Sequence, residues 1–409
     1  MLRIIALDQA QSFLERRAVR LAEAEQTVAP ILDSVRTRGD EAVLEYARKL
    51  DGFSGNDLRV STRNARVAAE FRTALEIAAG NIREFARMQL PQERWIVTPD
   101  GRRLGQVVRA LDSMGAYIPA GRYPLPSTLL MTVIPAQVAD VGAICIACPK
   151  PSEEILATAR FLGIDSIFRI GGAQAIAAMA FGTATVPRVD RIVGPGNIYV
   201  AAAKKLLAGE VGIDFVAGPT EIAIIAEDGD PRYIAGDMLA QAEHDVEASA
   251  ILFTTSPKLA EQVAVEVSRQ LEMLPTAPVA CESIRNNSAV IVCPAIDDAL
   301  EASNELAPEH LAIYDERWLT RIRHAGSIFV GPSSPEAAGD YASGPNHVLP
   351  TSGAARIRGG LSSADFVKVI TVQELTRDGL RQLAPAITTL ARAEGLEGHA
   401  RSVEVRLGQ

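Results

Sequence analysis

The sequence has few of the residues that mark several common classes of protein. Only four of its 409 residues are cysteine, and 5% are aromatic. Four scattered cysteines cannot build the dense disulfide framework of a small secreted domain. The most apolar long stretch, Leu129–Pro149, is interrupted by Pro135, Gln137 and Asp140, so it lacks the ~18 uninterrupted apolar residues of a membrane helix. These absences argue against both a disulfide-stabilised secreted domain and a membrane protein.

Basic residues are fewer than acidic ones, with 41 Lys and Arg against 50 Asp and Glu. The formal net charge is −9 and the isoelectric point is near 5.3, so a polyanion-binding surface is not expected as the main function. The short apolar run at the N-terminus is soon followed by charges, which fits neither a signal peptide nor a transit peptide. We therefore expect a cytoplasmic protein that acts neither on nucleic acid nor at a membrane.

Two of the cysteines form a C-x-x-C motif. Cys145 and Cys148 lie in the apolar run VGAICIACP, which predicts a buried strand. Residues three apart on a strand point to opposite faces, and a redox-active pair normally opens a helix. We interpret both thiols as core residues.

Hydrophobic periodicity predicts an α/β fold. Residues 20–98 are expected to be helical, because apolar residues recur at intervals of three and four in Glu23–Leu50 and Ala65–Gln89. From Gly142 onward, short β-branched runs alternate with alanine-rich helical segments, which is typical of parallel sheets covered by helices on both faces. The fold class expected is two Rossmann-like, doubly wound parallel-sheet domains with a helical N-terminal segment and a helical C-terminal tail.

The order of the predicted helices and strands also suggests how the chain divides into domains. We expect an N-terminal segment over residues 1–19 and a first Rossmann-like domain made of residues 20–115 together with 222–360. Residues 116–221 would form the second Rossmann-like domain. Residues 361–409 would form a tail with a helix over Asp378–Ala393.

The common nucleotide and nucleophile motifs are missing. No G-x-G-x-x-G follows a predicted strand, and neither a Walker loop nor a G-x-S-x-G elbow is present. Two glycine-rich turns, GGAQ at Gly171–Gln174 and GPGN at Gly194–Asn197, each connect a predicted strand to a predicted helix. Such positions bind ligands in open α/β sheets, and helix N-termini favour phosphate. Either turn could also be only a tight connection.

The histidines carry more information. There are five, and all follow residue 243. Imidazole, carboxylate and amide oxygen together suit zinc, although a histidine beside an acid is common and can merely cap a helix. His324 has no such neighbour and is interpreted as a cation at a helix C-terminus. The other four each have an acid or amide nearby in sequence: Gln241 with His244, Glu309 with His310, Asp340 with His347, and Glu394 with His399.

A series of longer segments resembles the histidinol dehydrogenase family. The segments occur in that family's order and with its spacings, and they span nearly the whole chain from about residue 20. They are GAYIPAGRYPLPST, GGAQAIAAMAFG, VDRIVGPGNIYVAAAKK, GIDFVAGPTE, DMLAQAEHD, NELAPEHL, GDYASGPNHVLPT and AEGLEGHA.

The resemblance implies a role for each matching residue. His310 would be the general base for two hydride-transfer steps, and Glu309 would activate water for the second. One Zn2+ ion per subunit would have four ligands: Gln241, His244, Asp340 and, from the partner chain of a homodimer, His399. The NAD+ contacts would be Tyr117, Gln174 and Asn197. The substrate contacts would be Thr220, Gln241, His244, His310, Asp340, His347, Glu394 and His399.

The implied reaction explains these residue types. Members of the family oxidise the amino alcohol L-histidinol through L-histidinal to L-histidine with two NAD+, the last steps of histidine biosynthesis. Zinc is redox-silent, so the hydride must go to a nicotinamide. Loss of hydride from an alcohol also requires loss of the hydroxyl proton, which an imidazole base can accept near neutral pH.

Some positions depart from the family's pattern. The turn usually written Pro-Gly-Gly contains Ala120 here and is followed by Arg122, and Thr220 stands where a serine is frequent. A related enzyme acting on another polar alcohol, such as a sulfonated diol, would fit Arg122 and Thr220, because an added cation can pair with a sulfonate. A non-catalytic zinc protein whose metal only joins a dimer would have no use for a glutamate–histidine pair. His347 and Glu394 favour an amino, imidazole-bearing substrate.

Overall fold

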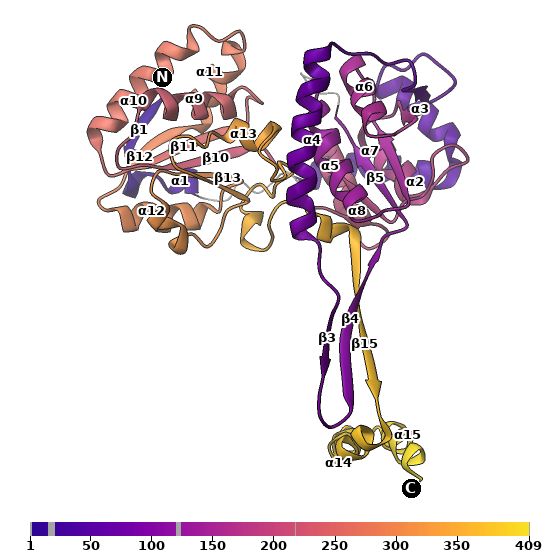
Figure 1. Cartoon of the computed structure of the whole chain (residues 1–409). Helices are drawn as coiled ribbons and strands as arrows, with labels where there is room; N and C mark the ends of the chain where they lie inside the picture. Colours follow the sequence, from indigo (N-terminus) through magenta and orange to yellow (C-terminus); the bar gives the residue numbers. More distant parts are fainter. Residues whose placement is uncertain (1, 15–20, 120–123, 217, 409) are drawn as a thin grey trace. The chain divides into compact units, whose positions relative to one another are not determined.

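The computed structural model describes residues 2–14, 21–119, 124–216 and 218–408, and Figure 1 shows their helices and strands. The chain divides into two compact units. The first unit comprises Met1–Gln89 and Asp112–Phe366, and the second comprises Leu90–Leu111 and Val367–Gln409. The expected α/β class is confirmed, because two sheets built mainly of parallel strands form the first unit.

One sheet of the first unit is entirely parallel. Its strands, in spatial order, are β1 (Arg3–Ala6), β12 (Ala289–Val292), β11 (Ser249–Thr254), β10 (Glu221–Ile225), β13 (His310–Ile313) and β14 (Ser327–Val330). Its helices are α1 (Gln11–Leu14), α9 (Pro231–Ala242), α10 (Pro257–Leu271), α11 (Ala277–Asn287), α12 (Ile296–Leu306) and α13 (Glu336–Tyr341). Short 3-10 helices cover Leu7–Gln9, Glu316–Arg321, Ala354–Arg356 and Ser363–Phe366.

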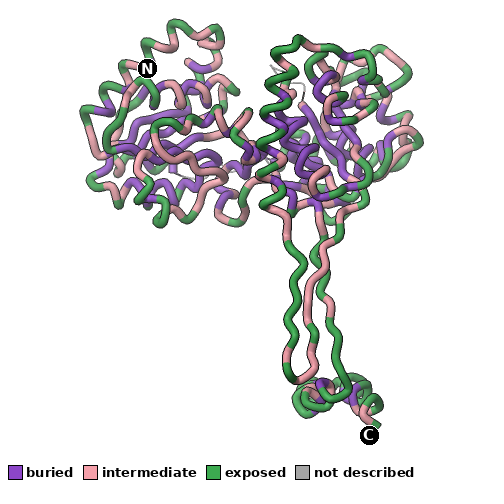
Figure 2. Tube along the Cα trace, viewed as in Figure 1, coloured by how far each residue is buried: buried purple, intermediate pink, exposed green. Residues whose placement is uncertain are grey.

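Alternation along the central strand of this sheet builds two cores. Ile222 and Ile224 of β10 pack with α9, α10 and α11 on one face. Ala223 and Ile225 pack with α1 and α12 on the other face. Successive side chains of a strand point to opposite faces, so a strand that is apolar throughout needs helices on both sides. Figure 2 shows the resulting buried band through the strands.

The other sheet of the first unit is mixed only at one edge. Its strands, in spatial order, are β2 (Arg59–Ser61), β7 (Ser166–Phe168), β6 (Ala143–Ala147), β5 (Ser113–Tyr117), β8 (Arg191–Val193) and β9 (Gly212–Ile213). The pair of β2 and β7 is antiparallel, and the other pairs are parallel. Its helices are α2 (Leu21–Arg38), α3 (Asp40–Leu50), α4 (Ala69–Gln89), α5 (Pro126–Val138), α6 (Glu153–Phe161), α7 (Gly172–Phe181) and α8 (Ile198–Leu207).

The grouping of the N-terminal part differs from the expectation. The expected helices over 23–50 and 65–89 are present as α2, α3 and α4, but α2 and α3 pack with α7 and α8 on the second sheet rather than with residues 222–360. The reason is their apolar faces, since Val28, Leu32 and Val35 of α2 join that sheet's core. The segment over residues 1–19 contributes β1 to the first sheet.

The C-x-x-C thiols are core residues, as expected. Cys145 and Cys148 are buried, and neither forms a disulfide. Burial raises the pKa of each thiol to about 12, so at neutral pH neither is a reactive thiolate.

The second unit contains a sheet that the sequence did not predict. Residues up to 98 were expected to be helical, yet β3 (Arg94–Val97) and β4 (Arg102–Ala110) form a hairpin, and β15 (Val367–Leu375) pairs with β4 along its whole length. Every residue of β3 is exposed, so no apolar alternation marks it as a strand. The expected tail helix is present as α14 (Arg377–Ala393), and α15 (Glu397–Leu407) follows it.

Gly194 provides a test of how closely two chain segments approach. It has a φ of +111°, and a Cβ added there would overlap the carbonyl oxygen of Tyr117. Gly209 has a similar φ of +103°, but a Cβ there would meet nothing within 4 Å. Gly194→Ala should lower the free energy of unfolding by about 3 kcal/mol or more, and Gly209→Ala by only about 1–2 kcal/mol. Urea denaturation measures both, and equal losses would show that the close approach does not require glycine.

Candidate active site

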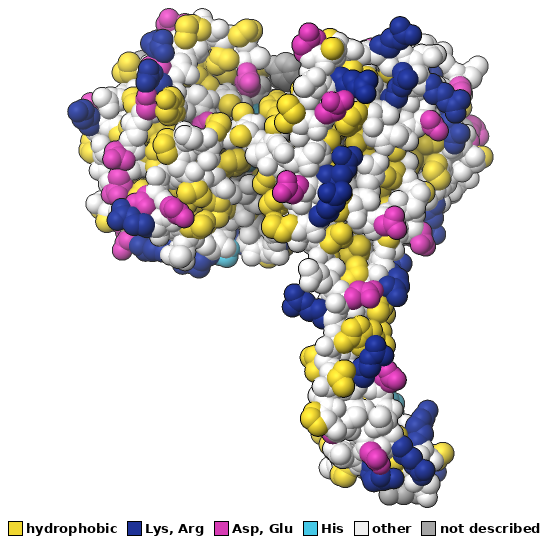
Figure 3. All heavy atoms as spheres, in the orientation of Figure 1, with side chains coloured by type: hydrophobic (Ala, Val, Ile, Leu, Met, Phe, Trp, Pro, Cys, Tyr) yellow, Lys and Arg dark blue, Asp and Glu magenta, His cyan; other side chains and the backbone are white. Residues whose placement is uncertain are grey.

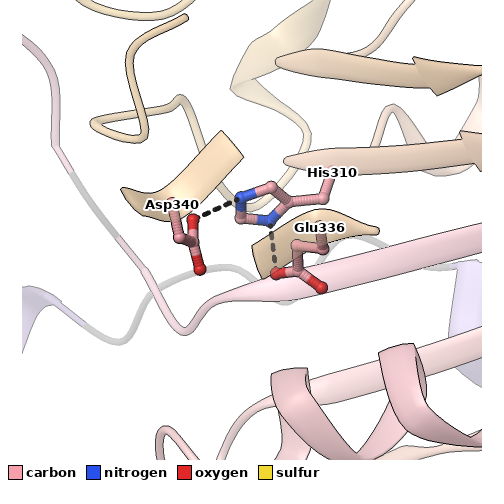
Figure 4. Close-up of side chains that lie close together, drawn as sticks. All are labelled: His310, Glu336 and Asp340. Carbon is pink, nitrogen blue, oxygen red and sulfur yellow. Dashed lines mark ion pairs between the residues drawn. The ribbon is translucent and has the colours of Figure 1, made fainter. Parts of the chain in front are cut away.

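The candidate site is built around a buried histidine. His310, the first residue of β13, is 3% exposed. Its Nδ1 lies 3.3 Å from Oε1 of Glu336, and its Nε2 lies 3.7 Å from Oδ1 of Asp340. Glu336 and Asp340 are one turn apart on α13, so both carboxylates face the imidazole. Figure 4 shows the ring between the two acids.

Glu309 joins the cluster from the residue before the strand. Its Oε2 accepts hydrogen bonds from Thr220 Oγ1 at 2.5 Å and from the backbone N–H of Glu221 at 3.0 Å. It also lies 3.7 Å from His310 Nδ1. The strand register brings Glu309 close to Thr220 and Glu221. β10 and β13 are neighbouring strands, and Ile222 of β10 is aligned with His310 of β13.

Burial and neighbouring charges shift the pKa values of the cluster. Burial opposes a charged imidazole, but Glu336, Glu309 and Asp340 outweigh it and raise the pKa of His310 to about 10. Burial raises the pKa of Glu309 and raises that of Glu336 well above its ordinary value. Burial also opposes charge on Asp340, but attraction to His310 and to the nearby His347 and His244 holds the pKa of Asp340 below its ordinary value. The cluster has more acids than one imidazolium can balance, which favours a further cation.

Gln241 and His244 reach the cluster from the end of α9. Gln241 is fully buried between Thr220 Oγ1, at 2.6 Å, and the carboxyl group of Glu336. His244 is half-exposed, and its Nε2 lies 3.8 Å from Oδ2 of Asp340. Asp340 therefore stands between two imidazoles, as a carboxylate that shares a metal with histidine would.

His347 lies on the other side of Asp340. Its Nδ1 is 2.8 Å from the carbonyl oxygen of Asp340, so this nitrogen donates, and its Nε2 is 3.4 Å from Oγ1 of Thr128. Burial lowers the pKa of His347. A neutral imidazole held by one nitrogen can offer the other nitrogen to a ligand.

The residues present fit a divalent metal ion. Ligand atoms of His310, Glu336 and Asp340 all lie within 4.8 Å of one another. Tetrahedral zinc ligands lie about 3.3–3.6 Å apart, which is close to the 3.8 Å between His244 and Asp340. Within the described part of the chain, the buried Nε2 of His310 has no hydrogen-bond partner of good geometry. Nitrogen and oxygen donors in this arrangement suit zinc.

The predicted cofactor residues meet at one edge of the second sheet. Its order β7-β6-β5-β8-β9 is that of a dinucleotide-binding half, with its switch point between β5 and β8. Tyr117 ends β5, and its hydroxyl accepts a hydrogen bond from Gly172 N at 3.1 Å. Asn197 caps α8 by accepting from Tyr199 N and Val200 N, each at 3.1 Å. Gln174 lies fully buried in the first turn of α7.

A buried ion pair fixes the GPGN turn. Lys204 Nζ lies 2.7 Å from Asp214 Oδ1 and donates to the carbonyl oxygen of Gly194 at 2.5 Å. Asp214 Oδ2 accepts from Gly194 N at 2.8 Å. Both backbone groups of Gly194 are therefore held by one charged pair, which gives the turn a single conformation.

The remaining predicted residues lie elsewhere. Glu394 and His399 belong to the second unit, where Glu394 follows α14, His399 lies on α15 and both are exposed. Ala120 and Arg122, two positions that depart from the family's pattern, lie outside the described residues. His324 lies in the loop before β14 and is not among the ligand atoms that cluster.

The sequence reasoning missed some residues of the site. Glu336 contacts His310, and its spacing of four from Asp340 in SSPEAAGDY was a signal for one helical face. Glu221 is partly buried, and burial together with Glu309 raises its pKa to about 7. Thr128 approaches His347 from α5, and no local pattern could have indicated that contact.

Two parallel sheets, one with dinucleotide-binding order and one carrying a buried imidazole–carboxylate cluster, define an α/β enzyme of the dehydrogenase class. The family model described as "Histidinol dehydrogenase" matches residues 14–407, and the chain belongs to that family. The family resemblance and the enzyme class expected from the sequence are thereby confirmed.

Individual relatives agree with this assignment. The chain is 48% identical to the histidinol dehydrogenase of Geobacter metallireducens, across 94% of this chain and 92% of that one. It is 44% identical to that of Bacillus anthracis, across 99% and 97% of the two chains. The crystal structure of histidinol dehydrogenase from Elizabethkingia anophelis matches with a TM-score of 0.95 and 37% identity, covering 100% of this chain and 98% of that one.

A more distant structure shares the fold alone. An acetylating aldehyde dehydrogenase from Geobacillus thermoglucosidasius matches with a TM-score of 0.52 at 13% identity, covering 90% of this chain and 97% of that one. Its likeness shows that this arrangement of sheets is not restricted to one family, so the function must be argued from the site.

Proposed function

We propose that the chain is a cytoplasmic, homodimeric, zinc-dependent and NAD-linked enzyme that oxidises L-histidinol through L-histidinal to L-histidine, the last steps of histidine biosynthesis. The observation that carries the proposal is the buried Glu309–His310 pair facing Asp340, Gln241 and His244. The names of the relatives favour histidinol over the sulfonated diol as substrate. A metal that only joined subunits would leave a buried base beside it without a role.

Zinc would be held by Gln241, His244, Asp340 and His399 of the partner subunit. Zinc supplies no redox chemistry, so when bound it orients and polarises the substrate. The support in this chain is the convergence of an amide, an imidazole and a carboxylate at one place. The carboxyl end of α9 precedes His244, and a helix C-terminus favours a cation.

His310 would remove the hydroxyl proton in both oxidations. Its Nδ1 lies 3.3 Å from the carbonyl oxygen of Glu221, and a proton on Nδ1 would occupy that contact. Nε2 would then be the nitrogen that accepts, and it faces Asp340. The neighbouring carboxylates favour the protonated form of His310, whereas a cation bound beside Asp340 would lower the pKa of His310 and leave Nε2 able to accept a proton.

Glu309 would activate the water needed in the second oxidation. An aldehyde must be hydrated before it can lose a second hydride, and a carboxylate can take the proton of the attacking water. Burial raises the pKa of Glu309, which makes its ionised form a better base. Thr220 and the Glu221 N–H hold one of its oxygens in place.

Two further ligands complete the proposal. NAD+ would lie at the switch point of the second sheet and contact Tyr117, Gln174 and Asn197. The substrate would also contact Thr220, His347 and Glu394. Because zinc cannot accept a hydride, the nicotinamide must do so in both steps.

A homodimer is supported by the surface of the second unit. Ile96 and Val97 of β3, Leu390 of α14 and Val405 of α15 are each more than 60% exposed. Figure 3 shows hydrophobic side chains over this unit. Apolar surface of this kind favours a protein partner, and a second copy would bring the exposed Glu394 and His399 to the substrate and the metal. Among the helices that the structure describes, none has the length and apolar character needed to cross a membrane.

The reaction itself provides the main test. The purified protein with zinc should form two NADH for each L-histidinol consumed, because one pocket performs two hydride transfers. Absorbance at the NADH band, together with quantification of histidine, measures the ratio. A ratio of one with aldehyde accumulating, or turnover of a sulfonated diol but not of histidinol, would refute the proposal.

The Glu309–His310 pair should separate the two steps. Glu309→Gln should impair oxidation of L-histidinal more than oxidation of L-histidinol, because only the aldehyde needs activated water. His310→Asn should slow both by a factor on the order of 10²–10⁴, the usual contribution of a positioned base. Steady-state assays starting from the alcohol and from the aldehyde measure this, and equal mild effects would show that the pair is misassigned.

The metal ligands can be tested against a matched histidine. His244→Asn should lose both zinc and activity, since it removes one ligand near Asp340. His324→Asn removes a histidine of the loop before β14 that is not a proposed ligand, and should keep both near the wild-type level. Elemental analysis after dialysis measures the zinc content. Loss of zinc from the His324 variant would contradict the ligand set.

A further inference from the structure

A carboxylate from a distant helix lies in the GGAQ turn. Asp51, the residue after α3, accepts hydrogen bonds from Gly171 N at 2.9 Å and from Gln174 Nε2 at 3.0 Å. Gly171 packs so closely on it that an added Cβ would lie 2.7 Å from Oδ1 of Asp51. Asp51 itself is only partly buried.

This arrangement changes what the turn can bind. A helix N-terminus with free backbone N–H groups is an anion site. Here the N–H of Gly171 is bonded to Asp51 and that of Gly172 to the Tyr117 hydroxyl. At the other turn, the Asn197 side chain accepts from two N–H groups of α8. A phosphate at the start of α7 would therefore meet the carboxylate of Asp51, and the N–H groups of Gly171 and Gly172 would not be free to bind it.

The groups that remain available at the GGAQ turn are acceptors. Among the described residues, both hydrogen bonds to the Asp51 carboxylate end on Oδ2, and Oδ1 accepts none. Gln174 is fully buried, and its Oε1 has no hydrogen-bond partner among the described residues. Hydrogen-bond acceptors at this turn favour a ligand that donates hydrogen bonds. The groups of a dinucleotide that can donate them here are its ribose hydroxyls.

We propose that Asp51 binds the ribose hydroxyls of the adenosine half of NAD and excludes the 2′-phosphate of NADP. The inference rests on the proposed use of NAD and extends it by naming the residue that sets cofactor preference. In other dinucleotide-binding folds, an acidic residue after the second strand binds the ribose hydroxyl. Asp51 takes this role here, although it follows α3, which precedes the strands of this sheet in the sequence. The nearby charge of Lys150 reaches Asp51 and would attract the 2′-phosphate once Asp51 is neutral.

Calorimetry with two fragments tests the proposal without turnover. The full chain should bind ADP-ribose more tightly than 2′-phospho-ADP-ribose. Asp51→Asn should weaken binding of ADP-ribose by about 10-fold, the usual loss for a hydrogen bond to a charged group, and should bring the preference to unity or reverse it. Steady-state kcat/KM with NAD+ and NADP+ should shift in the same direction, with the KM for histidinol changed by less than about 2-fold.

Asp40→Asn is the matched control. Asp40 opens the same helix, is partly buried, and accepts from Thr185 N at 3.3 Å and Thr185 Oγ1 at 2.6 Å, away from the GGAQ turn. This variant should keep the wild-type preference between the two fragments even if it is less stable.

The outcomes that would overturn the inference are distinct. An Asp51→Asn protein with the wild-type preference, or with equal losses for both fragments, would show that Asp51 only supports the turn. Failure of the wild-type chain to bind ADP-ribose would overturn it too. If instead the fragment preference shifts as expected but histidinol is not oxidised, the proposed substrate fails while the role of Asp51 stands.

Discussion

The candidate site depends on the burial of His310 among acids. Removing an imidazole and three carboxyl groups from water is costly unless they stabilise one another. Glu309, Glu336 and Asp340 therefore raise the pKa of His310, and burial raises the pKa of Glu309 and of Glu336. This constraint links β13 to β10, α9 and α13, and it makes the same group of residues suited both to proton transfer and to a bound cation.

In the two sheets of the first unit, the candidate site residues lie at opposite ends of the strands. The predicted cofactor residues follow the carboxyl ends of β5 and β8, as is usual for open α/β sheets. The catalytic candidates Glu309 and His310 stand at the amino end of β13, beside Thr220 before β10. The end of α9 then adds His244, where the helix dipole favours positive charge. In the proposed function, the second sheet binds the dinucleotide and the first sheet provides the base and the metal ligands.

Charged side chains hold the two glycine-rich turns, GGAQ and GPGN. Lys204 and Asp214 hold both backbone groups of Gly194, and Asp51 holds Gly171 and Gln174. A turn held by buried charges loses little freedom when a ligand binds. The missing glycine fingerprint is therefore replaced by side chains that satisfy the backbone and present their own acceptors.

The sequence by itself determined the family and the α/β class, because periodicity and motif spacing are local properties. It also indicated the helices α2, α3, α4 and α14. It did not determine that α2 and α3 cover the second sheet, or that β15 pairs with β4, because exposed strands such as β3 have no alternating pattern.

The contacts that shape the site were decided only by the tertiary structure. Asp51 lies 120 positions from Gly171, and Thr128 lies 219 from His347. Glu336 had a usable helical spacing, but its contact with His310 depends on where α13 lies beside β13. Packing of helices and register of strands bring such groups together, and neither is encoded in the neighbourhood of any one residue.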